Sequence, residues 1–270
     1  MTDTSCLGDV SKHATLAAAP APLQSTVEAS AKAKQVSSAT AVELTSEDKR
    51  KLAGSYWAPK DTKGAAPAAV LVHDAGGDRS QLAEVGGRLW KQGFAVVAID
   101  LRGHGESLGT DKSWAQLSEE ERGRAWTFAL RDVKAAAEWI TEQTGVHTSN
   151  VSLLGDRAGA TLVTRYAQRD DNVRCIVLLE PPTEQLGFNV AKDVATLAGL
   201  PTCIVAPKEC ASSAQSIADG GAAANDGNKF VEVICAKGGS GQCAADKTAV
   251  VGLAKFMSTQ ANPQKAADKK

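Results

Sequence analysis

A short motif at residues 154–159 has the spacing of a site for nucleophilic chemistry. Its residues, Leu-Gly-Asp-Arg-Ala-Gly, place two glycines around a central position, between an apolar strand-like run and a helical pattern. A sharp strand-to-helix turn of this kind exposes its central side chain, where enzymes hold a nucleophilic serine. Here the central residue is Arg157, whose guanidinium stays protonated and offers no electron pair to a carbonyl carbon. The spacing indicates a nucleophile turn, but the residue type does not supply the nucleophile.

Arg157 admits two interpretations. It could bind a small anionic ligand, because the N–H groups and the dipole at a helix N-terminus favour negative charge. It could instead pair inside the protein with Asp74, Asp156 or Glu180 and fill the pocket. Asp74 and Glu180 both follow strand-like runs, at the sheet edge where such pockets form. We favour internal pairing, because three carboxylates leave one guanidinium little positive potential for a ligand.

Two more loops carry polar residues next to predicted strands. The first is His-Asp-Ala-Gly-Gly at residues 73–77, and the second is Asp-Leu-Arg-Gly-His-Gly-Glu-Ser at residues 100–107. We expect their histidines and serine to shape their own loops rather than to carry out chemistry. Because the first loop ends at the same sheet edge as the turn at Arg157, Asp74, Ala75 and Ala158 are predicted to line one vestigial pocket.

The elements that must position these loops alternate between strands and helices. Two alternating runs within residues 40–59 flank a polar turn and predict a β-hairpin. Continuous apolar runs then predict buried parallel strands, and stripes of apolar residues at helical spacing separate them. The expected strands are 68–74, 94–100, 150–156, 173–180, 201–207 and 230–236, and the expected helices are 82–90, 119–144, 158–169 and 248–257. Such alternation predicts a mostly parallel sheet of about eight strands with helices on both faces.

This order and these loops resemble the α/β-hydrolase fold. The loop at 73–77 resembles the family's oxyanion loop, the loop at 100–107 resembles its D-x-R-G-x-G-x-S turn, and residues 154–159 resemble its nucleophile elbow. About 20 residues separate the strands at 173–180 and 201–207, which leaves no room for a cap domain. The chain is therefore most similar to compact members such as dienelactone-hydrolase-like, esterase and peptidase-like proteins.

The resemblance implies a Ser-Asp-His site for acyl transfer, and the chain departs from it at each position. The acid position after the strand at 201–207 is expected at Cys210, with Glu209 one residue out of register. The base should follow the strand at 230–236, yet the last histidine of the chain is His147. A carboxylate at Asp74, where the family has glycine, would repel a developing oxyanion. No catalytic residue is therefore assigned, and Cys210 and Glu180 are counted only as pocket residues.

Composition narrows the function classes. The chain has 270 residues, with 30 Lys+Arg against 31 Asp+Glu, which gives a formal net charge of −1. That balance excludes a strongly basic surface for nucleic acid, and no apolar run approaches the ~18 residues of a membrane-spanning helix. The six cysteines form no C-x-x-C pair and the chain has only four histidines, so no structural zinc site is expected. No other metal and no cofactor is predicted. Cys210, Cys235 and Cys243 lie near the ends of late elements and could pair in an oxidising compartment.

The domain organisation follows from the same counts. Residues 1–40 are rich in Ala, Ser, Thr and Pro and predict a disordered or stalk-like tail; residues 41–258 form the domain, and 259–270 a disordered basic end. No positively charged region precedes an apolar run, so the chain as written is expected to be soluble and cytoplasmic, and exported if a leader precedes this numbering.

Three functions are compatible with this pattern. The favoured one is a non-catalytic hydrolase-fold protein that binds a small anionic ligand or a protein partner. The second is a hydrolase of ester, peptide or acyl substrates with a different catalytic arrangement. The third is a structural or envelope-associated scaffold attached through the tail.

Overall fold

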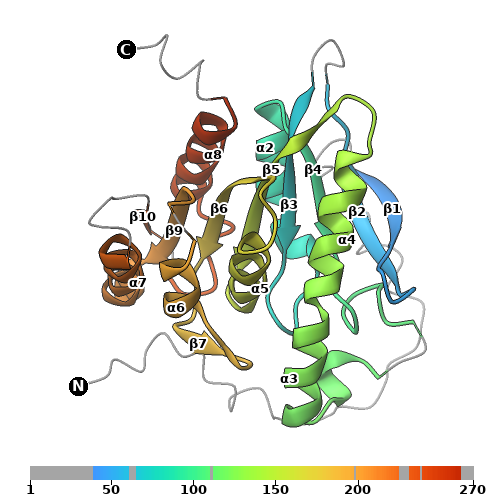
Figure 1. The fold of residues 1–270 in the computed structure, drawn as a ribbon, viewed down its shortest axis with the longest axis horizontal. Helices are drawn as coiled ribbons and strands as arrows, with labels where there is room; N and C mark the ends of the chain where they lie inside the picture. The colour runs from blue at the N-terminus through green and yellow to red at the C-terminus, as the bar shows by residue number, and fades with distance from the viewer. Residues whose placement is uncertain are drawn as a thin grey trace, which may run out of the picture.

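A computed structural model describes the chain as an eight-stranded sheet with helices on both faces (Figure 1). The described residues are 39–60, 65–109, 112–197, 199–224, 231–237 and 239–262. The strand order is β1-β2-β4-β3-β5-β6-β9-β10. The strands are β1 (Thr40–Thr45), β2 (Lys51–Trp57), β3 (Ala66–Val72), β4 (Ala95–Ile99), β5 (Val146–Asp156), β6 (Val173–Leu179), β9 (Thr202–Pro207) and β10 (Val231–Ala236). The prediction of an α/β-hydrolase fold is confirmed.

Strand pairing follows the sequence pattern. The expected hairpin is the antiparallel pair β1–β2, and β2 joins β4 antiparallel, while the remaining pairs are parallel. The central strands β3 and β4 are almost completely buried, as continuous apolar runs require. A small two-stranded sheet, β7 (Glu184–Gln185) and β8 (Phe188–Asn189), stands between β6 and β9 in place of a cap domain.

Two helical layers cover the sheet. On one face lie α2 (Ala83–Lys91) and α8 (Lys247–Ala261), and their buried residues share one apolar cluster. The other face carries α4 (Leu130–Thr141), α5 (Ala158–Ala167), α6 (Val190–Ala195) and α7 (Ala211–Ala224), whose buried residues form the second cluster. Helix α3 (Glu119–Phe128) extends the line of α4 beyond the sheet (Figure 1). Because helices cover both faces of the sheet, the loops that follow the strands meet at the ends of the strands.

Two expected helix boundaries differ from the structure. The helix predicted over 119–144 is interrupted at Ala129, whose N–H is shared between the carbonyls of Ala125 and Trp126. Helix α8 continues to Ala261, past the domain end expected at residue 258, because Ala261 is buried and its carbonyl accepts a hydrogen bond from Asn150. The tails expected at 1–40 and 259–270 otherwise lie mostly outside the described residues.

The turn at residues 100–107 is fixed by a buried ion pair. Arg102 Nε lies 3.0 Å from both carboxylate oxygens of Asp132 on α4, and its Nη1 lies 2.8 Å from Asp48 in the β1–β2 turn. Ser107 Oγ donates to the carbonyl of Asp100 and accepts from the N–H of Ala53. The turn thus joins the hairpin, the sheet and α4.

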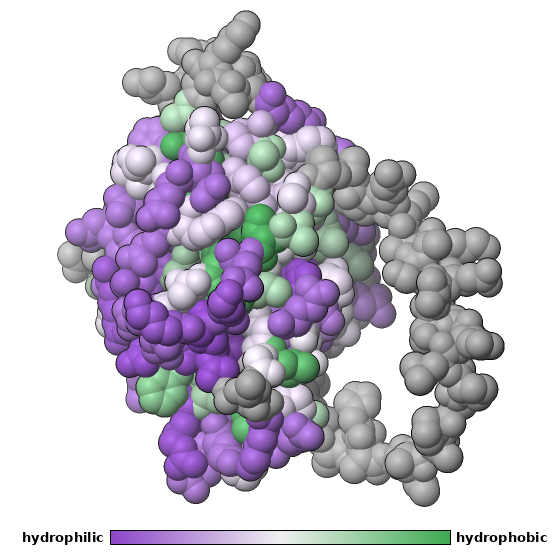
Figure 2. Space-filling model, turned by 90° about the vertical axis from the view of Figure 1, so that its right-hand side faces the viewer, coloured by the Kyte–Doolittle hydropathy of each residue, from purple (hydrophilic) through white to green (hydrophobic). Residues whose placement is uncertain are grey.

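Large hydrophobic side chains are rarely exposed within the described part of the chain. Figure 2 shows one face on which hydrophilic residues predominate and hydrophobic ones gather only in small patches. The exposed large hydrophobic side chains within the described ranges are Leu108, Phe128 and Val251, on three different segments. No helix of the described part is both long and apolar enough to cross a membrane.

Candidate functional site

Arg157 occupies a strained turn between β5 and α5. Its φ is +44° and its ψ is −110°, a conformation that a residue with a Cβ adopts only when its surroundings impose it. Two glycines allow the strand and the helix to approach closely. A Cβ on Gly155 would lie 2.5 Å from the backbone of α5, and one on Gly159 would lie 2.6 Å from the carbonyl oxygens of Val72 and His73. This is the backbone of a nucleophile elbow with an arginine at its centre.

We expect Gly159→Ala to destabilise the protein by about 1–3 kcal/mol, because the new methyl group would overlap two backbone carbonyls that cannot move independently of β3. The free energy of unfolding in urea measures the effect. Gly123→Ala on α3, where a Cβ would meet nothing within 4 Å, is the matched control and should be neutral or stabilising. Equal effects at the two glycines would contradict the role of Gly159 in this close contact.

The guanidinium of Arg157 forms ion pairs with carboxylates of its own chain. Its Nε lies 3.0 Å from Asp74 Oδ2 and its Nη2 lies 3.5 Å from Asp156 Oδ2. The angle at Nε is too bent for a hydrogen bond, so the contact with Asp74 is an ion pair. Nη1 approaches the far side of the site, where a Cβ at Gly241 would lie 3.0 Å away. The arginine side chain therefore spans the position above the elbow.

Asp74 connects the loop after β3 to the first turn of α5. Its Oδ1 accepts a hydrogen bond of 2.9 Å from the N–H of Ala158. Burial raises the pKa of Asp74, while Arg157 and the N–H groups of Ala158 and Ala75 act in the opposite direction. The structure thus brings together five of the residues expected at the pocket: Asp74, Ala75, Asp156, Arg157 and Ala158.

Glu180 plays a different part from the one expected. It follows β6 with a φ of +45°, and its carboxylate accepts from Ser240 Oγ at 3.0 Å, from the N–H of Gly241 at 2.6 Å and from the N–H of Cys243 at 3.1 Å. Of the three carboxylates expected to pair with Arg157, Asp74 and Asp156 do so. Glu180 instead holds the loop after β10 in place.

After β9 the side chain that faces the loop after β10 is that of Glu209, not that of Cys210. Glu209 Oε1 accepts a hydrogen bond of 3.0 Å from the N–H of Ser240, in the loop where a base would stand. Cys210 is 7% exposed and disulfide-bonded, so its sulfur is not available to the pocket. Cys243 is a free, buried thiol and is not its partner; the side chain of Cys235 lies outside the described part. The structure thus places Cys210 away from the other residues expected at the pocket.

The electrostatics of this cluster are dominated by carboxylates. Burial, with smaller effects from Asp74 and Glu180, raises the pKa of Asp156 to about 7, although Arg157 opposes the shift. One guanidinium thus faces Asp74 and Asp156, with Glu180 close by. Among the described residues no group of three metal-type ligands is placed to hold an ion. The described contacts of this cluster are thus those of a guanidinium with carboxylates of its own chain.

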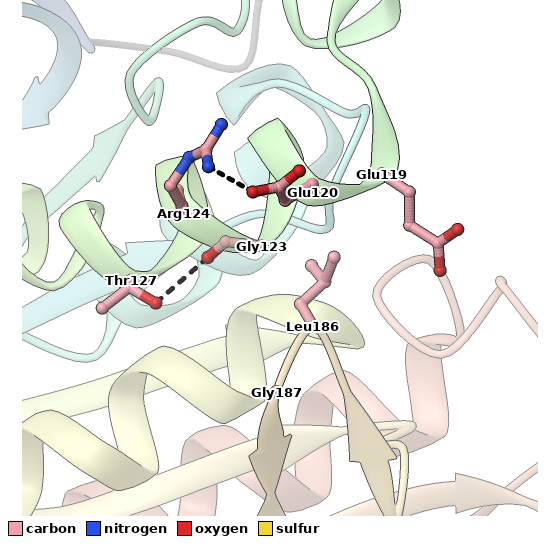
Figure 3. Close-up of a pocket in the computed structure, with 7 residues that line it drawn as sticks. All are labelled: Glu119, Glu120, Gly123, Arg124, Thr127, Leu186 and Gly187. Atoms are coloured by element: carbon pink, nitrogen blue, oxygen red, sulfur yellow. Dashed lines mark hydrogen bonds and ion pairs between the residues drawn. The ribbon is translucent and has the colours of Figure 1, made fainter.

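Two surface hollows lie away from this cluster. One, of about 510 Å³, separates the start of α3 from the β7–β8 turn, with Leu186 pointing toward α3 and Glu120 paired with Arg124 (Figure 3). The other, of about 410 Å³, lies beside β2 and includes Trp57 and Arg79. Arg157 lines neither of them.

Comparisons with known proteins agree on the fold family. Residues 65–202 match the family described as serine aminopeptidase, S33. Uncharacterized protein MT2364 of Mycobacterium tuberculosis (strain CDC 1551 / Oshkosh) is 29% identical over 126 residues, which span 47% of this chain and 40% of that protein. This chain therefore spans less than half the length of that curated relative.

Solved structures extend the similarity of the fold over most of the chain. DcsB, in a complex with its substrate analogue, superposes with a TM-score of 0.67 at 14% identity, covering 83% of this chain and 100% of that one. The esterase Pf2001 of Pyrococcus furiosus superposes with a TM-score of 0.63 at 17% identity, covering 83% of this chain and 91% of its own. At these identities the likeness concerns the fold.

Proposed function

We propose that this chain, which belongs to the α/β-hydrolase superfamily through the serine aminopeptidase S33 family, is a non-catalytic member whose role is binding. The observation that carries the proposal is Arg157 at the centre of the elbow, held by ion pairs to Asp74 and Asp156. An acyl-transfer enzyme needs an activated nucleophile at that point, and a guanidinium cannot serve as one. Function follows from the site and not from the scaffold.

The same geometry favours a protein partner over a small anion as the bound species. Arg157 already faces two carboxylates, so a free anion would meet little net positive charge at the elbow. A partner would instead contact the polar outer surface. The scaffold role attached through the N-terminal tail stays a prediction, because that tail lies outside the described residues.

A second candidate function is hydrolysis with a different catalytic arrangement. The family match and the esterase among the structural neighbours support it, and one contact offers a possible nucleophile. Ser240 Oγ donates to Glu180 Oε2 at 3.0 Å, as a serine would to a general base. Two backbone N–H groups also bind that carboxylate, so its oxygens are engaged in holding the loop after β10.

We expect no labelling of the wild-type chain by a fluorophosphonate probe, and turnover of p-nitrophenyl acetate no faster than with the heat-unfolded chain. Arg157→Ser should stay inert, because no histidine follows His147 to activate the new serine. An active serine esterase in the same assay verifies the probe. Labelling of the wild type that Ser240→Ala removes would replace this proposal with the second candidate.

A further inference from the structure

The hollow beside β2 is formed by segments that are far apart in the sequence. Its volume is about 410 Å³, which is within the range of small-molecule sites, and Arg157 does not line it. Strand β2 contributes Ser55 and Trp57, which share one face of the strand because they are two residues apart. The other lining residues come from the start of β1, the loop after β3, the start of α2 and the turn after β4: Ala39, Asp78, Arg79, Ser80, Ala83, Asp100, Gly105 and Glu106.

Arg79 forms one wall of this hollow and is held by three side chains. Its Nε donates to Ser55 Oγ at 3.1 Å, its Nη2 lies 2.5 Å from Glu106 Oε2, and its Nη1 pairs with Asp100. The Asp100 carboxylate also accepts the backbone N–H groups of Arg79 and Glu106, each at 2.8 Å. The arginine side chain is only 15% exposed, so its charge is used within the protein and the wall has a fixed shape.

Carboxylates outnumber positive charges around the hollow. Among the described residues that line it, Asp78, Asp100 and Glu106 carry carboxylates, and Arg79 alone carries a positive charge. A hydrogen bond from the Ser80 side chain lowers the pKa of Asp78, so this carboxylate is ionised at neutral pH. The side chain of Glu106 is 72% exposed and can reach a ligand from the solvent side. The hollow therefore attracts small cations and repels anions.

Trp57 adds a hydrogen-bond donor that the protein itself does not use. The residue is 2% exposed, and its indole Nε1 is buried with no hydrogen-bond partner in the described part of the chain. The six-membered ring of the indole packs against α2, where a Cβ at Gly86 would lie 2.8 Å from Cη2 and 2.9 Å from Cζ3. Leaving a buried N–H without an acceptor is destabilising, and an acceptor atom on a ligand in the hollow would relieve this.

We propose that this hollow binds a small organic cation in which a primary ammonium group lies a few bonds from a carbonyl oxygen. The three N–H groups of the ammonium suit the carboxylates of Asp78 and Glu106. The carbonyl oxygen accepts from Trp57 Nε1, and it brings no donor of its own into the apolar cluster around that ring. The site does not involve Arg157, so it is independent of whether the elbow binds or reacts.

A titration of the wild-type chain with glycinamide hydrochloride tests the proposal, because glycinamide carries both groups of the proposed class. The indole N–H signals are followed by NMR, and Trp57→Phe assigns the signal of Trp57 by removing it. Relative to sodium chloride of equal ionic strength, glycinamide should move this signal saturably. The signal of Trp126, which already donates to Thr161 Oγ1, should stay in place. A Trp57 signal that moves no more than that of Trp126 would overturn the proposal.

Two further compounds separate the contributions of the two groups. Propylamine hydrochloride carries the ammonium without the carbonyl oxygen, and acetamide carries the carbonyl oxygen without the charge. Each should bind about three- to tenfold more weakly than glycinamide. If propylamine bound as tightly as glycinamide, the role of Trp57 Nε1 would be wrong. If acetamide did so, the role of the carboxylates would be wrong.

A pair of variants distinguishes a site from general attraction between opposite charges. Glu106→Gln should weaken the binding of glycinamide about three- to fivefold. Glu142→Gln removes the same charge at an exposed position at the end of α4, on the opposite face of the sheet from α2, and should leave the affinity unchanged. Equal losses of affinity in the two variants would overturn the assignment of the hollow as the binding site.

Discussion

Arg102→Ala is expected to lower the free energy of unfolding by about 3–5 kcal/mol, because it breaks a buried ion pair. The substitution leaves the carboxylate of Asp132 completely buried and without its ionic partner. It also removes the contact with Asp48, one of the ion pairs that connect the β1–β2 turn to the rest of the protein. Urea unfolding followed by circular dichroism measures the loss.

Arg131→Ala is the matched control for this prediction. Arg131 also pairs with Asp48, at 3.3 Å, but its side chain is 40% exposed. Exposed pairs contribute less than about 1 kcal/mol, and this variant should stay within that range. If Arg102→Ala lowered the free energy of unfolding as little as Arg131→Ala does, the prediction would be wrong. The buried Asp132 carboxylate would then not be destabilising without its ionic partner.

Asp156→Asn is expected to stabilise the protein by about 2–4 kcal/mol at pH 8, with the gain disappearing below pH 4. Burial raises the pKa of Asp156 from 3.8 to about 7. Between these values the folded chain keeps a proton that the unfolded chain has released. Stability of the wild type therefore falls as pH rises from about 4 to about 7, and then stays level as far as this group is concerned.

The measurement is a series of urea unfolding curves from pH 4 to pH 8 for both proteins. Asp219→Asn, at an exposed position on α7, removes the same charge and is the control for a change in net charge. A wild type and an Asp156→Asn variant with parallel pH profiles would contradict the raised pKa. The outcome also shows over which pH range Arg157 has an ionised Asp156 as one of its two ion-pair partners.

Much of this fold could be predicted because its signals are local. Strands β3 and β4 are buried on both faces, so they stand out as uninterrupted apolar runs. The elbow could be located in the same way, since Gly155 and Gly159 are required wherever a strand and a helix meet so closely. The hairpin β1–β2 could be predicted because two runs of alternating apolar and polar residues flank a polar turn.

The contacts of the side chains that face the elbow were harder to predict. Each contact depends on the direction in which a loop residue points, and no local sequence pattern encodes that direction. Residues Lys208–Cys210 form a single 3₁₀ turn, which directs Glu209 toward Ser240 and buries Cys210. An offset of one residue there exchanges the two roles. Likewise, three carboxylates were equally plausible partners for Arg157, and only the fold around Glu180 shows that its oxygens are engaged elsewhere.

The strained backbone at residue 157 shows that the geometry of the elbow and the reactivity of its central side chain are separate properties. A φ of +44° costs a residue other than glycine about 1–3 kcal/mol. In this chain the packing of β5 against α5 maintains that conformation, although under our proposal Arg157 performs no acyl transfer. The two glycines allow the strand-to-helix turn to form, whereas reactivity depends on the side chains placed around it. The close approach of strand and helix at Gly155 and Gly159 is therefore kept even where the residue between them cannot act as a nucleophile.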